Sequence, residues 1–253
     1  MADAIFPSSI KSIPLFAGLT EQERDNLLSA GRTHNYSKGE HLFMHGDPLK
    51  NFYIICSGTV RLYRSTAEGN EVTTDIAISG KTMCKTEIFQ AARNHTVNAL
   101  AVDEVVVLEF PVSWLRDAVK NNNTLALNVI SALSRYAFMV EVEAEHQATM
   151  SSTQLVACFL QRLCILHEFN PQGFELPYSK SLIASRLGME LETFSRTLPK
   201  LKENGIRVEG TRVSIYDLDA IDAYVCGNCS IMEDCPTHQT LDKMMHKKKE
   251  GLA

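Results

Sequence analysis

Three cysteines and a histidine lie within thirteen residues near the end of the sequence, in the stretch CGNCSIMEDCPTH. Two residues separate Cys226 from Cys229, a spacing that lets two thiolates converge on one metal centre. Cys235 is followed by a proline, as is the last ligand of a bacterial ferredoxin motif. A [4Fe–4S] cluster would need a fourth ligand from elsewhere, whereas adding His238 gives a Cys3His set that suits zinc. The stretch predicts a metal site and leaves iron–sulfur, zinc and unligated thiols open.

Length and composition predict a globular protein with two domains. The 253 residues exceed the usual domain size of roughly 100–150, and 45% hydrophobic with 22% charged residues is ordinary. No apolar run approaches the ~18–20 residues of a membrane span, and no secretory signal is evident at the N-terminus. The four cysteines outside the stretch have apolar neighbours, which suits buried free thiols in a reducing cytoplasm: Cys56, Cys84, Cys158 and Cys164.

The order of expected elements predicts an α+β protein. Between residues 36 and 110, short apolar stretches alternate with glycine-containing turns, which predicts an antiparallel β-roll. After Pro111 the period becomes helical, and a heptad stripe predicts either a dimer seam or a helix packed on its own barrel: Val129, Leu133, Tyr136, Val140 and Glu143. From residue 150, two helices about Gly188 and two strands about Gly210 predict a winged helix-turn-helix. The expected divisions are a β-roll domain (1–120), a dimerisation helix (121–149), a DNA-binding domain (150–225) and a tail (226–253).

The second helix of that motif presents three polar side chains on one face. Burial of the opposite face, expected at Phe194, Leu198 and Leu201, leaves its polar residues outward: Glu192, Ser195 and Arg196. Arginine can bond guanine in a fork, and glutamate can accept from cytosine, so this trio suits the major groove. The alternative is a solvated helix face with a Glu192–Arg196 pair worth only about 0.3–0.5 kcal/mol.

The charge around this helix favours DNA over a solvated face. Between residues 178 and 212, seven basic residues, which include Arg186 and Lys200, stand against four acidic ones, while the whole chain carries −5. Such a segment can meet phosphates. Pro199 lies inside the helix and is expected to bend its axis, because it removes a hydrogen bond to the Ser195 carbonyl.

The stretches YSKGEHLFMHGD, FYIICSGTVRLY and LETFSR resemble the CRP/FNR superfamily of bacterial transcription regulators over nearly the whole chain. The last stretch resembles the E-x-x-S-R motif of the FNR branch. The resemblance implies a homodimer, no enzymatic activity, and promoter DNA and RNA polymerase as partners. It also implies that Glu192, Ser195 and Arg196 read TTGAT-like half-sites. The absence of a long apolar run predicts that no membrane is involved.

The cysteine stretch resembles a variant FNR branch, whose iron–sulfur cluster takes three cysteines after the DNA-binding domain and an acidic ligand from the dimerisation helix. That resemblance implies a cluster, [4Fe–4S], responding to oxygen, redox state or nitric oxide. Its fourth ligand stays open among Glu141, Glu143, Glu145 and His238. The superfamily also includes haem sensors, for which the candidate histidines are His34, His41, His45, His95 and His146. In the β-roll, Asn94-His95-Thr96 replaces the family's phosphate-binding Arg-Ser pair, so we expect a scaffold there and no cyclic nucleotide site.

Overall fold

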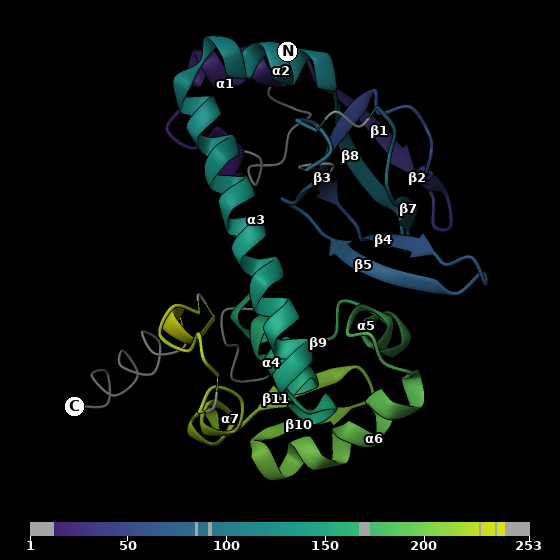
Figure 1. Ribbon diagram of the computed structural model, residues 1–253, viewed down its shortest axis with the longest axis vertical. Coiled ribbons are helices and arrows are strands. Elements are labelled where there is room, and N and C mark those ends of the chain that lie inside the picture. The colour runs from purple at the N-terminus through teal and green to yellow at the C-terminus, as the bar shows by residue number, and fades with distance from the viewer. Residues whose placement is uncertain are drawn as a thin grey trace. The chain divides into compact units, whose positions relative to one another are not determined.

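The computed structural model describes residues 13–83, 86–90, 93–166, 173–227, 229–235 and 237–240, and the chain divides into two compact units, residues 1–138 and 139–253. The long helix α3 (Asn123–Thr149) contributes residues to both units (Figure 1). The first unit is mainly antiparallel strands, and the second is mainly helices with a small sheet, which confirms the predicted α+β class. Cys84, expected to be a buried free thiol, lies outside the described residues.

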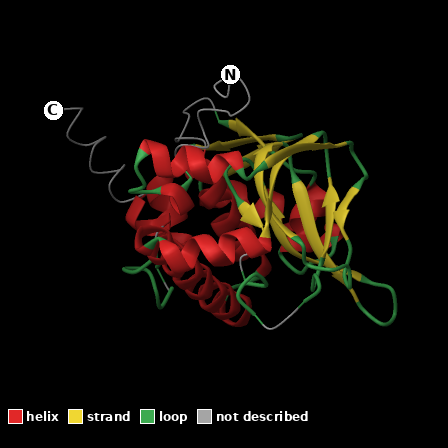
Figure 2. Cartoon of the chain, turned by 90° about the horizontal axis from the view of Figure 1, so that it is seen from above, coloured by secondary structure: helices red, strands yellow, loops and turns green. Residues whose placement is uncertain are grey.

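Two four-stranded antiparallel sheets form the β-roll of the first unit (Figure 2). Strand order is β1-β8-β3-β6 in one sheet and β2-β7-β4-β5 in the other. The strands are β1 (Arg32–Tyr36), β2 (His41–Phe43), β3 (Asn51–Ser57), β4 (Val60–Ser65), β5 (Glu71–Ala77), β6 (Thr82–Met83), β7 (Asn98–Ala101) and β8 (Val105–Pro111).

The core of the β-roll unit lies between its sheets and the helices beside them. Strand β3 is apolar without alternation, and its residues 52–56 are all buried because the strand is central in its sheet. The Phe52 and Phe110 rings stack with centroids 5.1 Å apart. Three helical segments precede or follow the strands: the 3-10 turn η2 (Pro14–Phe16), α1 (Glu21–Ser29) and α2 (Val112–Asn121). Helix α1 begins with a capping box between Thr20 and Glu23.

The first half of α3 packs the beginning of the heptad stripe on its own β-roll, and so does not present it as a dimer seam. Leu125 is fully buried and Val129 is 8% exposed, and both belong to the β-roll core, against which Leu133 also packs. Leu127 and Ile130, by contrast, are 63% and 60% exposed. The stripe that begins at Val129 therefore packs on its own barrel at that end, and the exposed apolar face begins at Leu127.

Helix α3 also meets the criteria of length and mean hydropathy for crossing a membrane, although the sequence contains no long uninterrupted apolar run. The two apolar faces explain this, since one packs on the β-roll and the other is exposed. A helix with both faces apolar reaches a high mean hydropathy without a continuous run. One helix of this length and composition is weak evidence for a membrane span, because the core helix of a soluble protein meets the same criteria.

The turn between β3 and β4 depends on Gly58, whose φ is +85°. A Cβ added there would lie 2.3 Å from the Glu104 carbonyl oxygen, so Gly58→Ala combines a left-handed alanine with a backbone clash. We expect a loss of more than about 2 kcal/mol in the free energy of unfolding, measured by urea denaturation. Gly69→Ala is the matched control, because Gly69 has the same φ with open space around it, and about 1–2 kcal/mol is expected there. Equal losses would contradict the clash.

The second unit is a winged helix-turn-helix followed by a short helix and the cysteine stretch. Its three-stranded antiparallel sheet has the order β10-β11-β9. Helix α4 packs against α6 and α7. The elements after α3 are α4 (Ser152–Leu166), β9 (Phe174–Glu175), α5 (Lys180–Arg186), α6 (Leu191–Leu201), the 3-10 turn η3 (Lys202–Asn204), β10 (Ile206–Glu209), β11 (Arg212–Ile215) and α7 (Leu218–Val225).

Candidate functional site

Helices α5 and α6 form the helix-turn-helix that the sequence predicts. The Ser179 hydroxyl caps α5 by accepting a bond from the Leu182 N–H at 3.2 Å. Ile183 and Ala184 are buried, as expected from the apolar spacing. Gly188, with a φ of +68°, ends the first helix and allows the chain to turn into the second.

Helix α6 has one buried face and one exposed face. Phe194 and Leu201 are fully buried, and Thr197 is 4% exposed, whereas Leu198 is only half-buried. The prediction of Leu198 as a core residue was thus partly wrong. Thr197 can occupy a buried position because its hydroxyl donates to the Phe194 carbonyl oxygen at 2.6 Å. The buried hydroxyl therefore has a hydrogen-bond partner.

The three predicted base-reading residues lie on the exposed face of α6. Glu192, Ser195 and Arg196 are all exposed, and the first and last approach each other to 3.8 Å in a weak surface ion pair. Lys200, one turn after Arg196, is exposed as well. Both alternatives from the sequence, a DNA-reading face and a solvated face, are compatible with this exposure.

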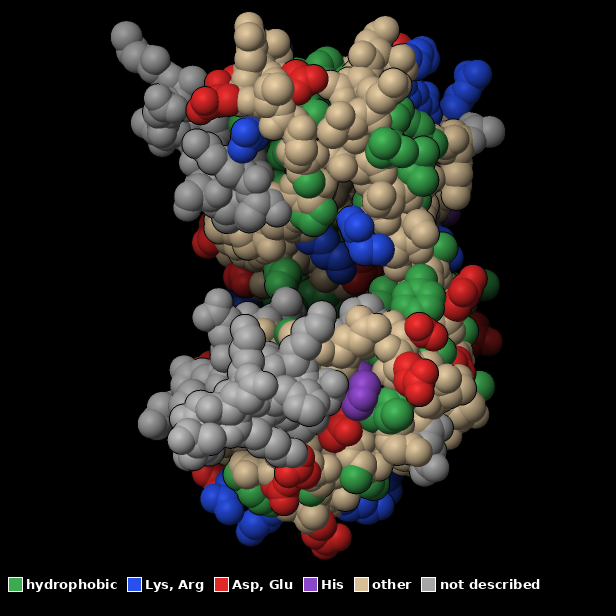
Figure 3. Space-filling model, turned by 90° about the vertical axis from the view of Figure 1, so that its left-hand side faces the viewer, with side chains coloured by type: hydrophobic (Ala, Val, Ile, Leu, Met, Phe, Trp, Pro, Cys, Tyr) green, Lys and Arg blue, Asp and Glu red, His purple; other side chains and the backbone are tan. Residues whose placement is uncertain are grey.

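Basic side chains gather around this helix. Figure 3 shows Lys and Arg side chains at the lower end of the view, the end that carries α6 and the β10–β11 wing in Figure 1, with acidic side chains among them. Arg207 and Arg212 on the wing are each near a glutamate, at 3.9 Å from Glu209 and 3.7 Å from Glu175. The surface is therefore mixed in charge, and exposed ion pairs of this kind break readily for phosphates.

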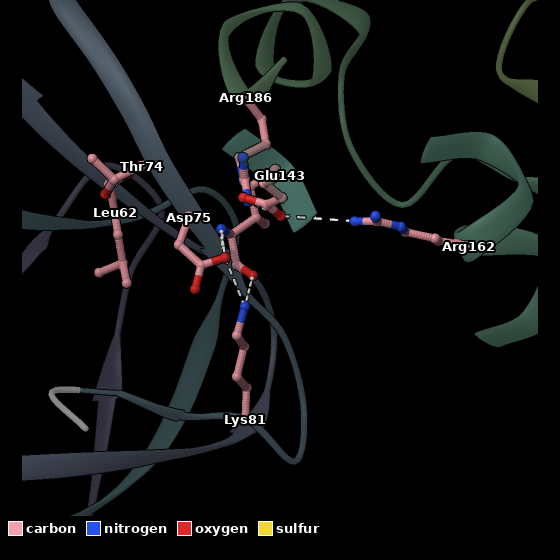
Figure 4. Close-up of polar contacts among 8 residues, drawn as sticks. Leu62, Thr74, Asp75, Lys81, Glu143, Arg162 and Arg186 are labelled. Carbon is pink, nitrogen blue, oxygen red and sulfur yellow. Dashed lines mark hydrogen bonds and ion pairs between the residues drawn. The ribbon is translucent and has the colours of Figure 1, made fainter. Parts of the chain in front are cut away.

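Arg186, a predicted DNA contact, is engaged within the protein. Its guanidinium donates to both carboxylate oxygens of Glu143 on α3 at 2.7 Å. Figure 4 shows Glu143 between Arg186 and Arg162, whose Nη1 lies 3.7 Å from the same carboxylate. Glu143 thus joins the end of α3 to α4 and α5. A phosphate contact by Arg186 and metal ligation by Glu143 would each require this pair to open.

The cysteine segment, defined here as residues 226–235, follows α7 and meets the last turns of α3. Cys229 Sγ lies 3.5 Å from His146 Nε2. The Ser230 hydroxyl donates a short hydrogen bond to the Glu145 carboxylate. Cys226, Cys235 and His146 are buried, at 6%, 6% and 4% exposure, and Cys229 is partly exposed. The structure therefore brings a histidine of α3 to one of the predicted thiol ligands, Cys229.

Three thiols of this region, those of Cys158, Cys226 and Cys235, are buried, and that of Cys229 is partly exposed. Burial raises the pKa of the Cys226 thiol, and Asp222 raises it further. Burial also raises the pKa of Cys229. For Cys158 on α4, burial raises the pKa, the Arg162 guanidinium opposes this, and the Cys235 and Cys229 thiols raise it further. Buried thiols of this kind suit a thiophilic metal, whose binding stabilises the thiolate forms and releases protons.

Two members of this neighbourhood escaped the sequence prediction as ligand candidates. Cys158 was expected only as a buried free thiol, and His146 only as one of several haem candidates. Both residues are far from residue 226 in the sequence. No spacing rule links residues 146 and 158 to a motif so far along the chain, so the sequence could not identify them as ligand candidates. The one available signal was chemical type: His146 lies one residue beyond the predicted ligand range Glu141 to Glu145.

The predicted fourth ligands occupy different surroundings. Glu141 is exposed, Glu143 pairs with arginines and Glu145 accepts from Ser230. His238 Nδ1 lies 2.9 Å from Asp222 Oδ1, and ligand atoms of Asp222, Cys226 and His238 lie within 4.8 Å of one another. Among the described residues, this is the group of three whose donor atoms are close enough to hold one ion.

The β-roll has a buried polar cluster where the family resemblance places a nucleotide phosphate. His95 is 3% exposed, stacks on Phe43 with ring centroids 3.7 Å apart, and lies 4.0 Å from the Glu87 carboxylate. Burial lowers the pKa of His95, and Glu87 opposes this. Glu87 also accepts bonds from the Thr96 N–H and hydroxyl, at 2.8 and 2.5 Å. These side chains bind one another at the centre of the predicted scaffold.

Two family models match the chain in succession. Residues 33–122 match the cyclic nucleotide-binding domain, and residues 154–224 match the Crp-like helix-turn-helix domain. The first description concerns the domain type, whose matched range includes the buried His95–Glu87 cluster.

Curated relatives resemble the chain over most of its length. The fumarate and nitrate reduction regulatory protein of Yersinia pestis is 28% identical over 232 residues, covering 87% of this chain and 89% of the relative. The anaerobic regulatory protein of Pasteurella multocida is 28% identical over 225 residues, covering 84% of this chain and 79% of the relative.

Solved structures have the same fold. A putative cAMP-binding regulatory protein from Silicibacter pomeroyi is similar with a TM-score of 0.62 and 26% identity, covering 87% of this chain and 99% of that one. A CooA variant from Carboxydothermus hydrogenoformans has a TM-score of 0.65 at 22% identity, covering 79% and 90% of the two chains, a likeness of fold alone.

Proposed function

Because the chain belongs to the CRP/FNR family of bacterial transcription regulators, we propose that it binds specific promoter DNA and that a metal centre at its cysteine segment controls this binding. The proposal places the protein in the cytoplasm as a homodimer that works with RNA polymerase and has no enzymatic activity. The observation that carries it is helix α6, which buries Phe194 and Leu201 and exposes Glu192 and Arg196. A helix of this kind in a helix-turn-helix reads base edges in the major groove.

The proposed target is an inverted repeat of TTGAT-like half-sites whose centres lie one helical turn apart, about 10–10.5 bp. Arg196 would donate two bonds to a guanine, and Glu192 would accept from a cytosine. Ser195, between them in sequence and exposed on the same face, would contact a base or a phosphate.

Arg196→Ala is expected to weaken operator binding by about 1–3 kcal/mol and to relax the preference at one base pair, because a bidentate base contact is lost. Lys200→Ala, also an exposed position of α6, is the matched control. It should weaken binding to all sequences alike and lower the salt dependence, since a lysine there would meet phosphate. Fluorescence anisotropy with operator and scrambled duplexes measures both effects. Equal loss on both duplexes for Arg196→Ala would contradict base reading.

The proposed dimer forms through the exposed apolar face of α3. Leu127 and Ile130 are three residues apart and are the most exposed large apolar side chains of the helix. An exposed pair of this type is stabilised when a second copy covers it. Two copies are also what an inverted repeat requires, since each would place its α6 at one half-site.

The proposed metal centre is an iron–sulfur cluster held by Cys226, Cys229 and Cys235. Two observations support it: Cys229 of the segment lies beside His146 of α3, and the curated relatives include a protein named for anaerobic regulation. When bound, such a cluster, [4Fe–4S] in the variant-branch scheme, would supply sensitivity to oxygen, redox state or nitric oxide. The chain itself supplies the connection from the cysteine segment to the end of α3, through His146, Glu145 and Ser230.

A structural zinc site is the second candidate, and one geometric observation favours it. The donor atoms of Asp222, Cys226 and His238 lie close enough together for a single ion. The 2.9 Å contact of His238 Nδ1 with Asp222 Oδ1 holds the imidazole beside the other two donors. In that case the protein would be a DNA-binding regulator without a redox-responsive centre.

Metal analysis separates the two candidates. The native chain, purified without oxygen, is expected to be brown and to contain iron and acid-labile sulfide. One zinc per chain without sulfide would contradict the proposed iron–sulfur centre and support the zinc site. A haem absorption band would point instead to the β-roll, where His34, His41 and His45 are exposed and His95 is buried.

A further inference from the structure

Helix α4 presents one face to the end of α7, where the cysteine segment begins. Gln154 Nε2 on α4 donates to the Tyr224 carbonyl oxygen at 3.2 Å, two residues before Cys226. Cys158 lies one turn further along α4 on the same face, because residues four apart are neighbours on a helix. Cys158 is a free thiol and is 6% exposed. The packing of α4 on α7 therefore brings a buried thiol of α4 to the start of the segment.

The thiols of Cys158 and the segment influence one another electrostatically. Burial is the largest cause of the raised pKa of Cys158, and the Cys235 and Cys229 thiols raise it further. For Cys226, burial raises the pKa most, Asp222 follows, and the Cys158 thiol adds to the shift. Since the interaction of two charges weakens with distance, these effects agree with a position of Cys158 among the segment thiols.

The arrangement of these four thiols suits a cluster better than a single ion. The ligand atoms of one tetrahedral ion lie close together, whereas each cysteine of a four-iron cluster binds a different iron atom. Among the described residues, no three of these thiols belong to a group whose donor atoms all lie within 4.8 Å of one another. Four cysteines are the usual ligand set of a [4Fe–4S] cluster.

Two side chains next to Cys158 on α4 have buried polar atoms that lack a hydrogen-bond partner within the described part of the chain. Gln161 is fully buried, and neither its amide nitrogen nor its amide oxygen is bonded; Nε of Arg162 is also buried and unbonded. Both residues follow Cys158 at the spacing of helix neighbours. A buried N–H group without an acceptor is costly. The sulfur atoms of a bound cluster accept hydrogen bonds from donors of this kind.

The acidic ligands that α3 was expected to offer have other surroundings. The Glu143 carboxylate accepts from Arg186 with both oxygens, and Glu145 accepts from a hydroxyl of the segment. Glu141 is exposed. The pairs of Glu143 and Glu145 would have to open before either carboxylate could bind iron, whereas Cys158 is a free thiol.

We infer that Cys158 is the fourth ligand of the cluster proposed at Cys226, Cys229 and Cys235, giving a four-cysteine set; this rests on the proposed function. The fourth ligand then comes from α4, in the DNA-binding unit, and not from α3. Because α4 packs against α6, the cluster would connect the cysteine segment to a neighbour of the helix proposed to read bases. Loss of the cluster would remove this connection.

The native full chain, reconstituted anaerobically with Mössbauer-active iron and sulfide, gives the first test. With four cysteine ligands, the Mössbauer spectrum should show only irons with the isomer shifts of sulfur-ligated sites. An oxygen or nitrogen ligand would instead give one iron in four a clearly higher isomer shift. That pattern would overturn the inference.

Cys158→Ser gives the second test. The variant should hold less than about a tenth of the native iron and sulfide after the same reconstitution, because a thiolate ligand is lost. Cys164→Ser is the matched control. Cys164 is a free thiol on the same helix and is 4% exposed, but burial alone raises its pKa to about 11, with no contribution from another thiol. Cys164→Ser should keep the native iron and sulfide content.

The outcomes separate the inference from the proposed function. Native iron and sulfide content in Cys158→Ser would contradict the fourth ligand and leave the proposed iron–sulfur centre standing. A native chain that holds zinc and no sulfide would contradict that centre, and the inference with it. Circular dichroism of the metal-free chains checks that Cys158→Ser folds. Should this variant misfold, the Mössbauer spectrum of the native chain decides by itself.

Discussion

Cys229→Ser protein, purified without oxygen, is expected to be colourless and to hold less than about a tenth of the iron and sulfide of the native chain. Serine retains the size of the side chain but replaces the soft thiolate that iron–sulfur clusters require. Cys226→Ser and Cys235→Ser should have the same effect, because the segment contains no further thiol that could take the place of the lost ligand. The three replacements should also change operator affinity, since the segment contacts the end of α3.

Cys56→Ser is the control for this prediction. Cys56 is also a buried free thiol, 8% exposed, but it lies in the β-roll unit on β3. Its replacement should leave the colour, iron and operator affinity unchanged. Iron and sulfide assays with absorption spectra measure the outcome. If the three serine variants keep the native iron content, the cysteine segment does not hold the cluster.

Ile130→Glu is expected to convert the protein into a monomer and to weaken operator binding by at least about 100-fold. Ile130 is 60% exposed on α3, and covering an isoleucine in each of two copies stabilises a dimer by about 3–6 kcal/mol in total. A glutamate at position 130 removes this stabilisation and places two negative charges close together in the dimer. Since every 1.4 kcal/mol is about tenfold in affinity, loss of the dimer removes most of the gain from binding two half-sites together.

Val72→Glu is the matched control for the dimer prediction. Val72 is 48% exposed on β5, so the same substitution adds the same charge to an apolar surface position away from α3. Sedimentation at micromolar concentration should give twice the chain mass for the native protein and for Val72→Glu, and the single chain mass for Ile130→Glu. A native monomer that binds operator DNA tightly would contradict the dimer.

The sequence by itself determined the order and type of the main elements and the exposed face of α6. Spacings of three and four around Phe194 and Leu201 reflect the helical period, which is local, so the outward position of Glu192 and Arg196 follows from the residue pattern alone. The glycine-rich alternation of the β-roll is equally local. Thr197 was missed as a core residue because its burial depends on a hydrogen bond to the Phe194 carbonyl that polarity scales do not include.

Only the tertiary structure decided how α3 uses its faces and what meets the cysteine segment. Both faces of α3 carry apolar residues, so periodicity could not choose between Val129 and Ile130; packing against the β-roll buries the first and leaves the second exposed. The sequence showed three thiols and a set of acidic candidates, but the approach of His146 to Cys229 spans 83 residues. Contacts over such separations are fixed by how α3, α4 and α7 pack, and no local pattern encodes that packing.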